Sequence, residues 1–301
     1  MASRHFLSFF DLTRAEAAEV LARASELKRL RAQNILPLLF ERKVLAMIFE
    51  KSSTRTRVSF ESAMIEGGGG AIFLSLQDSQ LGRGEPIGDT ARVLSEMCDA
   101  IIARTYAHST VEELAAQASV PVINALTDRL HPCQVLADLQ TYQEHRGGIA
   151  GRKVAWIGDG NNMCNTYIEA AQVCDFELAI STPPEFVPPI QDFVRGDANV
   201  SWNRDPQSAV TGADLVVTDV WVSMGQEASA DHRRALLNPY QVDSALMSHA
   251  KTDALFMHCL PAHRGEEVTA EVIDHVNSVV WDEAGNRLHA QKALLEFLLR
   301  S

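Results

Sequence analysis

Short apolar runs and helical patterns alternate along the whole chain. In the first half, compact apolar runs bounded by polar residues predict buried strands at 43–50, 71–76, 100–104 and 120–125. The spacing of apolar residues predicts helices at 13–31, 55–66, 87–96 and 111–118. The first helix opens with Thr13-x-x-Glu16, the pattern of a capping box. Buried strands separated by helices indicate a parallel sheet.

A second series with the same alternation follows a helical pattern at 134–144 and the Gly147-Gly148 pair. We predict its strands at 153–158, 177–181, 215–219, 254–260 and 278–282. A last helix is predicted at 287–299, and it docks on the core through the face that carries Leu288, Leu295 and Leu299. The pattern predicts an α/β protein of two domains, each a parallel sheet flanked by helices. We place them at residues 1–147 and 148–286, followed by a C-terminal helix at 287–301.

The composition is that of a folded globular protein with an acidic balance. Of the 301 residues, 27 are Lys or Arg and 39 are Asp or Glu, so the formal net charge is −12 at pH 7. This charge argues against a nucleic-acid binder with a basic surface and against electrostatic attachment to an anionic membrane. An anionic substrate would need a local basic site that works against the global charge.

The cysteines and the apolar runs indicate a cytoplasmic protein. The apolar runs fall short of the roughly 18–20 residues of a membrane span, and the first residues lack the pattern of a signal peptide. The five cysteines are odd in number and contain no Cys-x-x-Cys. That usage fits a reducing compartment better than a disulfide framework.

The stretch Lys51-Ser52-Ser53-Thr54-Arg55-Thr56-Arg57 lies where a predicted strand ends and a helix begins. A helix N-terminus offers free backbone N–H groups and a positive dipole end, which suit a phosphate. The hydroxyls and Arg55 can add hydrogen bonds and a bidentate contact. The alternative interpretation is a helix cap with a solvated basic turn.

The segment Gly158-Asp159-Gly160-Asn161-Asn162 begins like a dinucleotide-binding fingerprint. It lacks the third glycine. In that fingerprint the acidic residue that binds the ribose lies at the end of the next strand, whereas Glu177 lies at the start of the next predicted strand. A nicotinamide-dependent oxidoreductase is therefore weakly supported. The chain also lacks the nucleotide P-loop pattern.

Four motifs in order resemble those of the carbamoyltransferase family. They are Ser53-Thr54-Arg55-Thr56, His131-Pro132-Cys133-Gln134, Asp219-Val220-Trp221-Val222-Ser223-Met224-Gly225 and His258-Cys259-Leu260-Pro261. The last two are similar to the signatures of the branch that acts on ornithine. The resemblance covers nearly the whole chain, and no motif departs from the pattern at a defining position.

The resemblance implies a carbamoyl-phosphate-binding domain first and an ornithine-binding domain second, linked by two helices. It implies that the C-terminal helix packs back on the first domain. It also implies a homotrimer, or a multiple of trimers, with each site at a subunit interface. Gln80 would then reach the carbamoyl phosphate of a neighbouring subunit.

The implied reaction transfers the carbamoyl group of carbamoyl phosphate to the δ-amine of L-ornithine, giving L-citrulline and phosphate. The implied reaction is compatible with arginine biosynthesis and, in the reverse direction, with arginine catabolism. The carbamoyl-phosphate-binding residues implied are Ser53, Thr54, Arg55, Thr56, Gln80, Arg104, His131, Pro132, Cys133, Gln134, Cys259, Leu260 and Arg287. The ornithine-binding residues implied are Asn162, Asp219, Ser223 and Met224. The implied catalytic residues are Cys259, Arg104, His131 and Asp219.

The chemistry requires an uncharged amine as nucleophile. An alkyl ammonium titrates near 10.4, so the reactive form costs about 4–5 kcal/mol at pH 7. Cys259 and Asp219 are the candidate proton acceptors; the sequence leaves open which of them acts. Cys259 as a covalent nucleophile and Cys259 as a plain core residue are the alternatives.

This chemistry needs no redox group and no Lewis acid, so we expect no cofactor and no metal. His258, Cys259 and His263 suggest a metal site, but the intervening Leu260-Pro261 argues against one helical face. The alternatives for the function are a carbamoyltransferase acting on aspartate, putrescine or an acylated ornithine, and a non-catalytic protein of the same fold. Asp219 disfavours aspartate as the second substrate, because that substrate calls for a basic site.

Overall fold

The structure is a computed structural model that describes residues 3–75, 84–196, 199–222 and 227–300. The chain divides into two compact units. Unit 1 consists of Met1–Gln140 and Gly285–Ser301, and unit 2 of Thr141–Ala284. The chain passes between the units within two helices, α5 (Pro132–Arg146) and α12 (Val280–Leu299). The boundaries of functional domains at residues 147 and 286 stay predictions.

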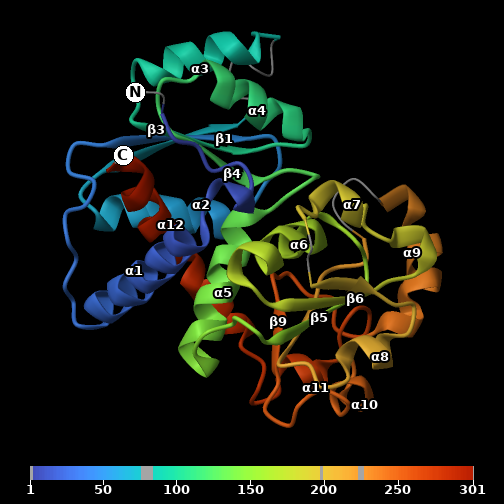
Figure 1. The fold of residues 1–301 in the computed structure, drawn as a ribbon. Helices are drawn as coiled ribbons and strands as arrows, with labels where there is room; N and C mark the ends of the chain where they lie inside the picture. The colour runs from blue at the N-terminus through green and yellow to red at the C-terminus, as the bar shows by residue number, and fades with distance from the viewer. Residues whose placement is uncertain (1–2, 76–83, 197–198, 223–226, 301) are drawn as a thin grey trace. The chain divides into compact units, whose positions relative to one another are not determined.

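Unit 1 is built on a parallel sheet with the strand order β2-β1-β3-β4. Its strands are β1 (Val44–Phe49), β2 (Gly70–Ser75), β3 (Ala100–Arg104) and β4 (Val122–Leu126). Helices α3 (Ile87–Ser95) and α4 (His108–Gln117) lie on one face, and α2 (Thr54–Glu66) lies on the other (Figure 1). The central strands β1 and β3 are nearly all buried because both faces are covered, which is why they are continuous apolar runs.

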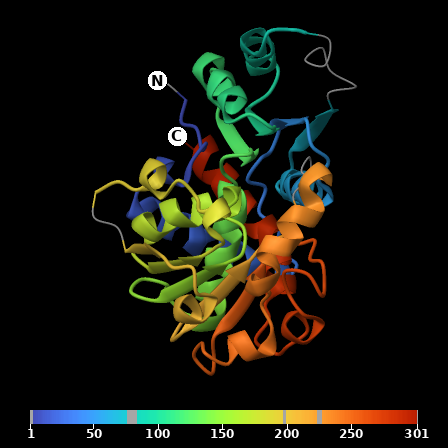
Figure 2. The same ribbon diagram turned by 90° about the vertical axis from the view of Figure 1, so that its right-hand side faces the viewer.

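Three helices of unit 1 are tied together by ion pairs. Helix α1 (Arg14–Ala32) begins at the expected capping box and joins α12 through Arg23 and Glu296, whose Nε and Oε2 atoms lie 2.7 Å apart. Glu66 of α2 pairs with Arg31 of α1 and with Lys292 of α12. The Arg4 guanidinium lies 4.8 Å from the centre of the Phe297 ring, so the first described residues and the end of α12 lie side by side (Figures 1 and 2).

Unit 2 is built on a second parallel sheet, with the order β7-β6-β5-β8-β9. Its strands are β5 (Lys153–Ile157), β6 (Glu177–Ser181), β7 (Val200–Trp202), β8 (Leu215–Thr218) and β9 (Leu255–His258). Helix α6 (Asn162–Cys174) lies on one face, and the short helices α8 (Pro206–Val210), α10 (Ser244–Met247) and α11 (Ala270–Ile273) lie on the other (Figure 1). Two short helices complete the unit, α7 (Ile190–Phe193) and α9 (Ala230–Leu237). The predicted fold class, two parallel sheets flanked by helices, is confirmed.

The strand predicted at 278–282 is wrong. Ser278 makes an isolated bridge with Phe256, and α12 begins at Val280. The apolar Val279-Val280 pair resembles a strand. Asp282 and Glu283 follow it in the first turn of the helix, where acidic side chains interact favourably with the positive end of the helix dipole.

Helix α12 is also more deeply buried than one apolar face predicts. Leu295 is buried as expected, whereas Leu288 and Leu299 are only partly buried. Gln291 and Lys292 are at most 2% exposed, so α12 carries polar groups into the interior of unit 1. Among the described residues, none of the helices combines the length and the apolar character needed to cross a membrane.

The glycines of the Gly158-Asp159-Gly160 segment are explained by packing within unit 2. Gly158 has a φ of +119°, which favours glycine. At Gly160, a Cβ atom would lie 2.2 Å from the carbonyl oxygen of Phe186 and 2.6 Å from Cδ of Pro188. The loop that carries Phe186 and Pro188 therefore requires a glycine at this position.

We expect Gly160→Ala to destabilise the protein by about 1–3 kcal/mol, the usual range for overpacking. The physical reason is that the added methyl meets backbone atoms, which cannot rotate away as a flexible side chain does. Chemical denaturation measures the change. Gly148→Ala is the matched control, because a Cβ there meets nothing within 4 Å. Equal stability of the two variants would contradict the packing explanation.

Candidate functional site

The end of β1 and the start of α2 hold the Ser53–Thr56 motif in a fixed conformation. Ser53 is the N-cap of α2, and its Oγ accepts a hydrogen bond from the backbone N–H of Thr56. The same hydroxyl donates to Oγ1 of Thr56 at 3.0 Å. Thr56 is fully buried, Ser53 and Arg55 are half-buried, and Thr54 is exposed. The cap therefore directs the Thr56 hydroxyl inward.

Arg287 of α12 joins this helix start to the first turn of α5. It is 2% exposed. Its Nη2 donates to Oγ1 of Thr56 at 3.0 Å, and its Nη1 donates to Oε1 of Gln134 at 2.7 Å. Gln134 in turn donates through Nε2 to the buried Asp138 at 2.9 Å. Three of the residues predicted from separate parts of the sequence are thus in direct contact within unit 1.

His131, which immediately precedes α5, lies within a cationic cluster. Its side chain is buried, and burial lowers the pKa of its imidazole well below the usual value. The charges of Arg287, Arg104 and Arg55 lower this pKa further. Arg104 is itself buried at the end of β3. His131 is therefore a neutral imidazole at physiological pH, in a site whose positive charge is carried by arginines.

The two remaining residues of the His-Pro-Cys-Gln motif, Pro132 and Cys133, have roles in the fold of unit 1. Pro132 is the first residue of α5, where its fixed φ suits a helix start. The Cys133 thiol donates to the backbone carbonyl of Asn124 at 3.3 Å, and burial raises its pKa to about 12. Cys133 is therefore a neutral thiol inside unit 1.

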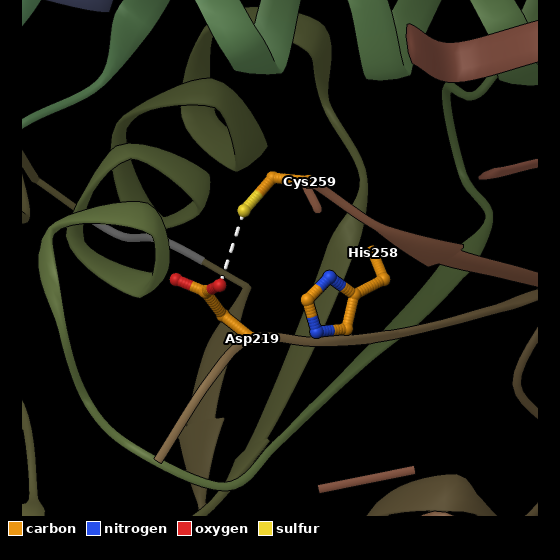
Figure 3. A group of neighbouring side chains, drawn as sticks. All are labelled: Asp219, His258 and Cys259. Atoms are coloured by element: carbon orange, nitrogen blue, oxygen red, sulfur yellow. Dashed lines mark hydrogen bonds between the residues drawn. The ribbon is translucent and has the colours of Figure 1, made fainter. Parts of the chain in front are cut away.

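In unit 2, Asp219 and Cys259 meet at the ends of neighbouring strands. Asp219 directly follows β8 and Cys259 directly follows β9. The Cys259 thiol donates to Oδ1 of Asp219 at 3.1 Å, as Figure 3 shows. Asp219 is 7% exposed, and Cys259 is half-buried. The carboxyl ends of parallel strands thus present an acid and a thiol in contact.

Asn161 orients Asp219, and sequence reasoning missed it. Its Nδ2 donates to Oδ2 of Asp219 at 2.7 Å. Its Oδ1 caps α6 by accepting from the backbone N–H groups of Met163 and Cys164. The predicted Asn162 is the first residue of α6 and is half-buried. An asparagine directly before a helical pattern indicates a helix cap, and this pattern is the sequence signal that could have indicated Asn161.

His258 lies beside this pair (Figure 3) and makes hydrogen bonds of its own with other residues. Its Nδ1 accepts from the backbone N–H of Leu260 at 2.9 Å, so its proton lies on Nε2 and is donated to the fully buried Glu267 at 3.1 Å. Leu260 has a φ of +56°. Asp219, His258 and Cys259 place potential metal ligands within 4.8 Å of one another. Metal binding by His258 would break one of its two hydrogen bonds.

A buried ion pair connects the segment after β5 with the segment that follows Asp219. Nη2 of Arg233 lies 2.6 Å from Oδ2 of Asp159, and its Nε donates to the carbonyl of Trp221 at 2.7 Å. The guanidinium carbon lies 4.3 Å from the centre of the Phe186 ring. Burial raises the pKa of Asp159 to about 6, and Arg233 opposes that rise. Sequence reasoning did not find this pair, because its members are 74 residues apart in the chain.

Three of the predicted residues, Gln80, Ser223 and Met224, lie outside the described residues. The structure places the other predicted residues in two groups. Thr56, Gln134 and Arg287 are in contact in unit 1, and Asp219 and Cys259 are in contact in unit 2.

Two family models match the chain. The aspartate/ornithine carbamoyltransferase carbamoyl-P binding domain matches residues 4–144, and the aspartate/ornithine carbamoyltransferase Asp/Orn binding domain matches residues 150–298. The chain belongs to the aspartate/ornithine carbamoyltransferase family.

Relatives in this family resemble the chain over its full length. The anabolic ornithine carbamoyltransferase of Pseudomonas aeruginosa is 58% identical over 99% of this chain and 98% of its own. The ornithine carbamoyltransferase of Methylococcus capsulatus is 60% identical over 99% of each chain. The solved ornithine carbamoyltransferase from Pyrococcus furiosus superposes with a TM-score of 0.93, at 50% identity, over 98% of this chain and 96% of that one.

Arg287 is a point where the family models and the spatial units differ. The Asp/Orn binding model extends over Arg287, yet this residue lies in unit 1 and contacts Thr56 and Gln134 there. The fold of this chain therefore completes the cationic cluster of unit 1 with a residue from the far end of the sequence.

The neutral state of His131 predicts a loss of stability in acid. Its pKa is lower in the folded protein than in the unfolded chain, so the unfolded chain takes up a proton below about pH 6.5 and the folded protein does not. We expect His131 to lower the free energy of unfolding by about 1 kcal/mol as the pH falls from 6.5 to 5.5.

Urea unfolding at pH 7.5 and 5.5 measures this effect, with His131→Gln as the variant that does not titrate at this position. The wild type is expected to lose more stability than the variant between the two pH values. A parallel loss in both proteins would show that His131 is not held neutral by the fold.

Proposed function

We propose that the chain is an ornithine carbamoyltransferase, which transfers the carbamoyl group of carbamoyl phosphate to the δ-amine of L-ornithine. The products are L-citrulline and phosphate. The observation that carries the proposal is the 58–60% identity, over 99% of the chain, to proteins named ornithine carbamoyltransferase. The word anabolic in the name of the Pseudomonas relative supports a role in arginine biosynthesis.

The cationic cluster of unit 1 suits the phosphate of carbamoyl phosphate. In this proposal the Ser53–Thr56 segment and its helix N-terminus bind phosphate oxygens, with Arg55, Arg104 and Arg287 supplying positive charge. These charges stabilise the leaving phosphate as negative charge develops on it. His131, neutral and able to donate one proton, is suited to polarise the carbonyl without adding a further charge. Gln134 is proposed to bind the carbamoyl NH₂ group.

The acid–thiol pair of unit 2 suits a cationic amino acid. In this proposal Asp219 binds the α-ammonium group of ornithine, Asn162 and backbone N–H groups bind its α-carboxylate, and Ser223 and Met224 complete the ornithine contacts. Cys259 is proposed as a proton acceptor for the δ-amine, and the Leu260 carbonyl as a partner of the carbamoyl NH₂ group. The hydrogen bond from Cys259 to Asp219 supports a shared role, because the thiol proton can move to the carboxylate as the sulfur accepts the proton of the amine.

The family resemblance and the surface of unit 1 support an assembly. We propose a homotrimer or a multiple of trimers in the cytoplasm, in which Gln80 reaches a neighbouring subunit's carbamoyl phosphate. Val58 and Ile65 of α2 are 54% and 70% exposed, and Ile72 on the edge strand β2 is 49% exposed. Exposed apolar residues on an uncovered strand and its adjacent helix are typical of a surface that another subunit covers.

The proposal is tested by the formation of carbamoylated product with four amines. We expect citrulline from ornithine, and much slower carbamoylation of aspartate, putrescine and acetylornithine, because Asp219 and the proposed α-carboxylate contacts suit free ornithine. A colorimetric citrulline assay and mass spectrometry of the other products measure the rates. Preference for another amine would exclude the ornithine assignment, and the absence of carbamoylation of all four would exclude the enzyme.

Cys259→Ser is expected to lower kcat by about tenfold or more and to weaken ornithine binding, because a hydroxyl ionises far less readily than a thiol and so does not supply an anionic base. The midpoint of thermal unfolding, Tm, is expected to stay within a few degrees of the wild-type value. Cys174→Ser is the matched control, since Cys174 is also half-buried and lies at the end of α6. Wild-type turnover in Cys259→Ser would remove this residue from the mechanism.

A further inference from the structure

Gln291 of α12 lies one helical turn beyond Arg287, on the same side of the helix, and is fully buried. The orientation of its amide is decided by its neighbours. With the oxygen toward Arg287, it accepts from Nε at 3.0 Å and from Nη2 at 2.9 Å. Its nitrogen then donates to Oγ of Ser59 at 2.5 Å. The opposite orientation would place donors against the donors of Arg287.

Ser59 connects Gln291 to the start of α2. The Ser59 hydroxyl donates to the backbone carbonyl of Arg55 at 2.7 Å and also lies 3.1 Å from that of Thr56. A continuous chain of hydrogen bonds therefore leads from the Arg287 guanidinium through Gln291 to the first turn of α2. That turn is the one that the proposed function assigns to the phosphate.

Three acceptors that hold Arg287 in this network are neutral oxygens. They are the Thr56 hydroxyl, the Gln134 amide and the Gln291 amide. Neutral acceptors fix the plane of a guanidinium and satisfy its N–H groups, but they leave its positive charge available to an anion. A carboxylate in place of any one of them would form an ion pair with the guanidinium and compete with the phosphate.

We propose that Gln291 is a positioning residue for Arg287, which fixes the guanidinium for the phosphate of carbamoyl phosphate and itself adds no negative charge beside it. This inference rests on the proposed function. Gln291 acts through Arg287 and Ser59, so its contribution is to the placement of the anion and not to the proton transfer in unit 2.

The test replaces Gln291 with an isosteric acid and with an isosteric apolar residue. We expect Gln291→Glu to weaken the binding of inorganic phosphate about tenfold or more, because a carboxylate at hydrogen-bond distance offsets the charge of Arg287. Gln291→Met keeps the volume and adds no charge, so it is expected to weaken phosphate binding less than Gln291→Glu does. It should raise KM for carbamoyl phosphate several-fold while leaving KM for ornithine near the wild-type value. Calorimetry with phosphate and steady-state kinetics measure these effects.

Gln117→Glu is the matched control. Gln117 is exposed on α4, and its Oε1 accepts from Nη2 of Arg92 at 2.5 Å, so this variant makes the same charge change beside another arginine. We expect wild-type phosphate binding from it.

The outcomes separate this inference from the function on which it rests. Wild-type phosphate binding in Gln291→Glu would overturn the inference alone. Equal losses of affinity in the Glu and Met variants would also overturn it, because they would indicate a packing effect without a charge effect. If Gln291→Glu fails to fold, equal changes in the two KM values of Gln291→Met would have the same meaning. A wild-type protein that binds neither phosphate nor carbamoyl phosphate would overturn the proposed function as well.

Discussion

The buried guanidinium of Arg287 is the constraint around which unit 1 is arranged. Removing a charged group from water costs several kcal/mol unless its hydrogen bonds are replaced. The fold replaces them with a hydroxyl from α2, an amide from α5 and the Gln291 amide of α12 itself. Each partner must be held as well, which explains the cap at Ser53 and the contact between Gln134 and Asp138. One buried charge thus accounts for the order of much of the surrounding polar network.

The same constraint explains the protonation state of His131. A second cation beside three arginines would add repulsion to the cost of burial, so the imidazole stays neutral. The cluster consequently has a fixed charge, carried by guanidinium groups that do not titrate in the physiological range. A site of this kind keeps its attraction for an anion over a wide pH range, whereas a site built on lysine or histidine would not to the same degree.

Much of the fold and part of the site could be predicted from the sequence, because both depend on local pattern. The alternation of apolar runs predicts both sheets, and Ser53–Thr56 lies at a strand-to-helix junction as expected. The contacts that join distant segments could not be predicted in the same way. Thr56 and Arg287 are separated by 231 residues, and only the packing of α12 against α2 makes them neighbours. The failure at 278–282 has a related cause, since its apolar pair begins a buried helix.

The division of charge between the units also gives a physical meaning to the acidic composition. The net charge of −12 opposes the binding of any anion at long range. Unit 1 overcomes it locally with buried arginines, where screening by salt and competition from water are weak. In unit 2, Asp219 is buried and held by Asn161 and Cys259, so the position of its carboxyl group is fixed. The two proposed substrates are opposite in charge at their recognised ends. In the proposed function, an anion and a cation are therefore each matched by groups whose positions the fold has already fixed, and the global charge favours only the cation.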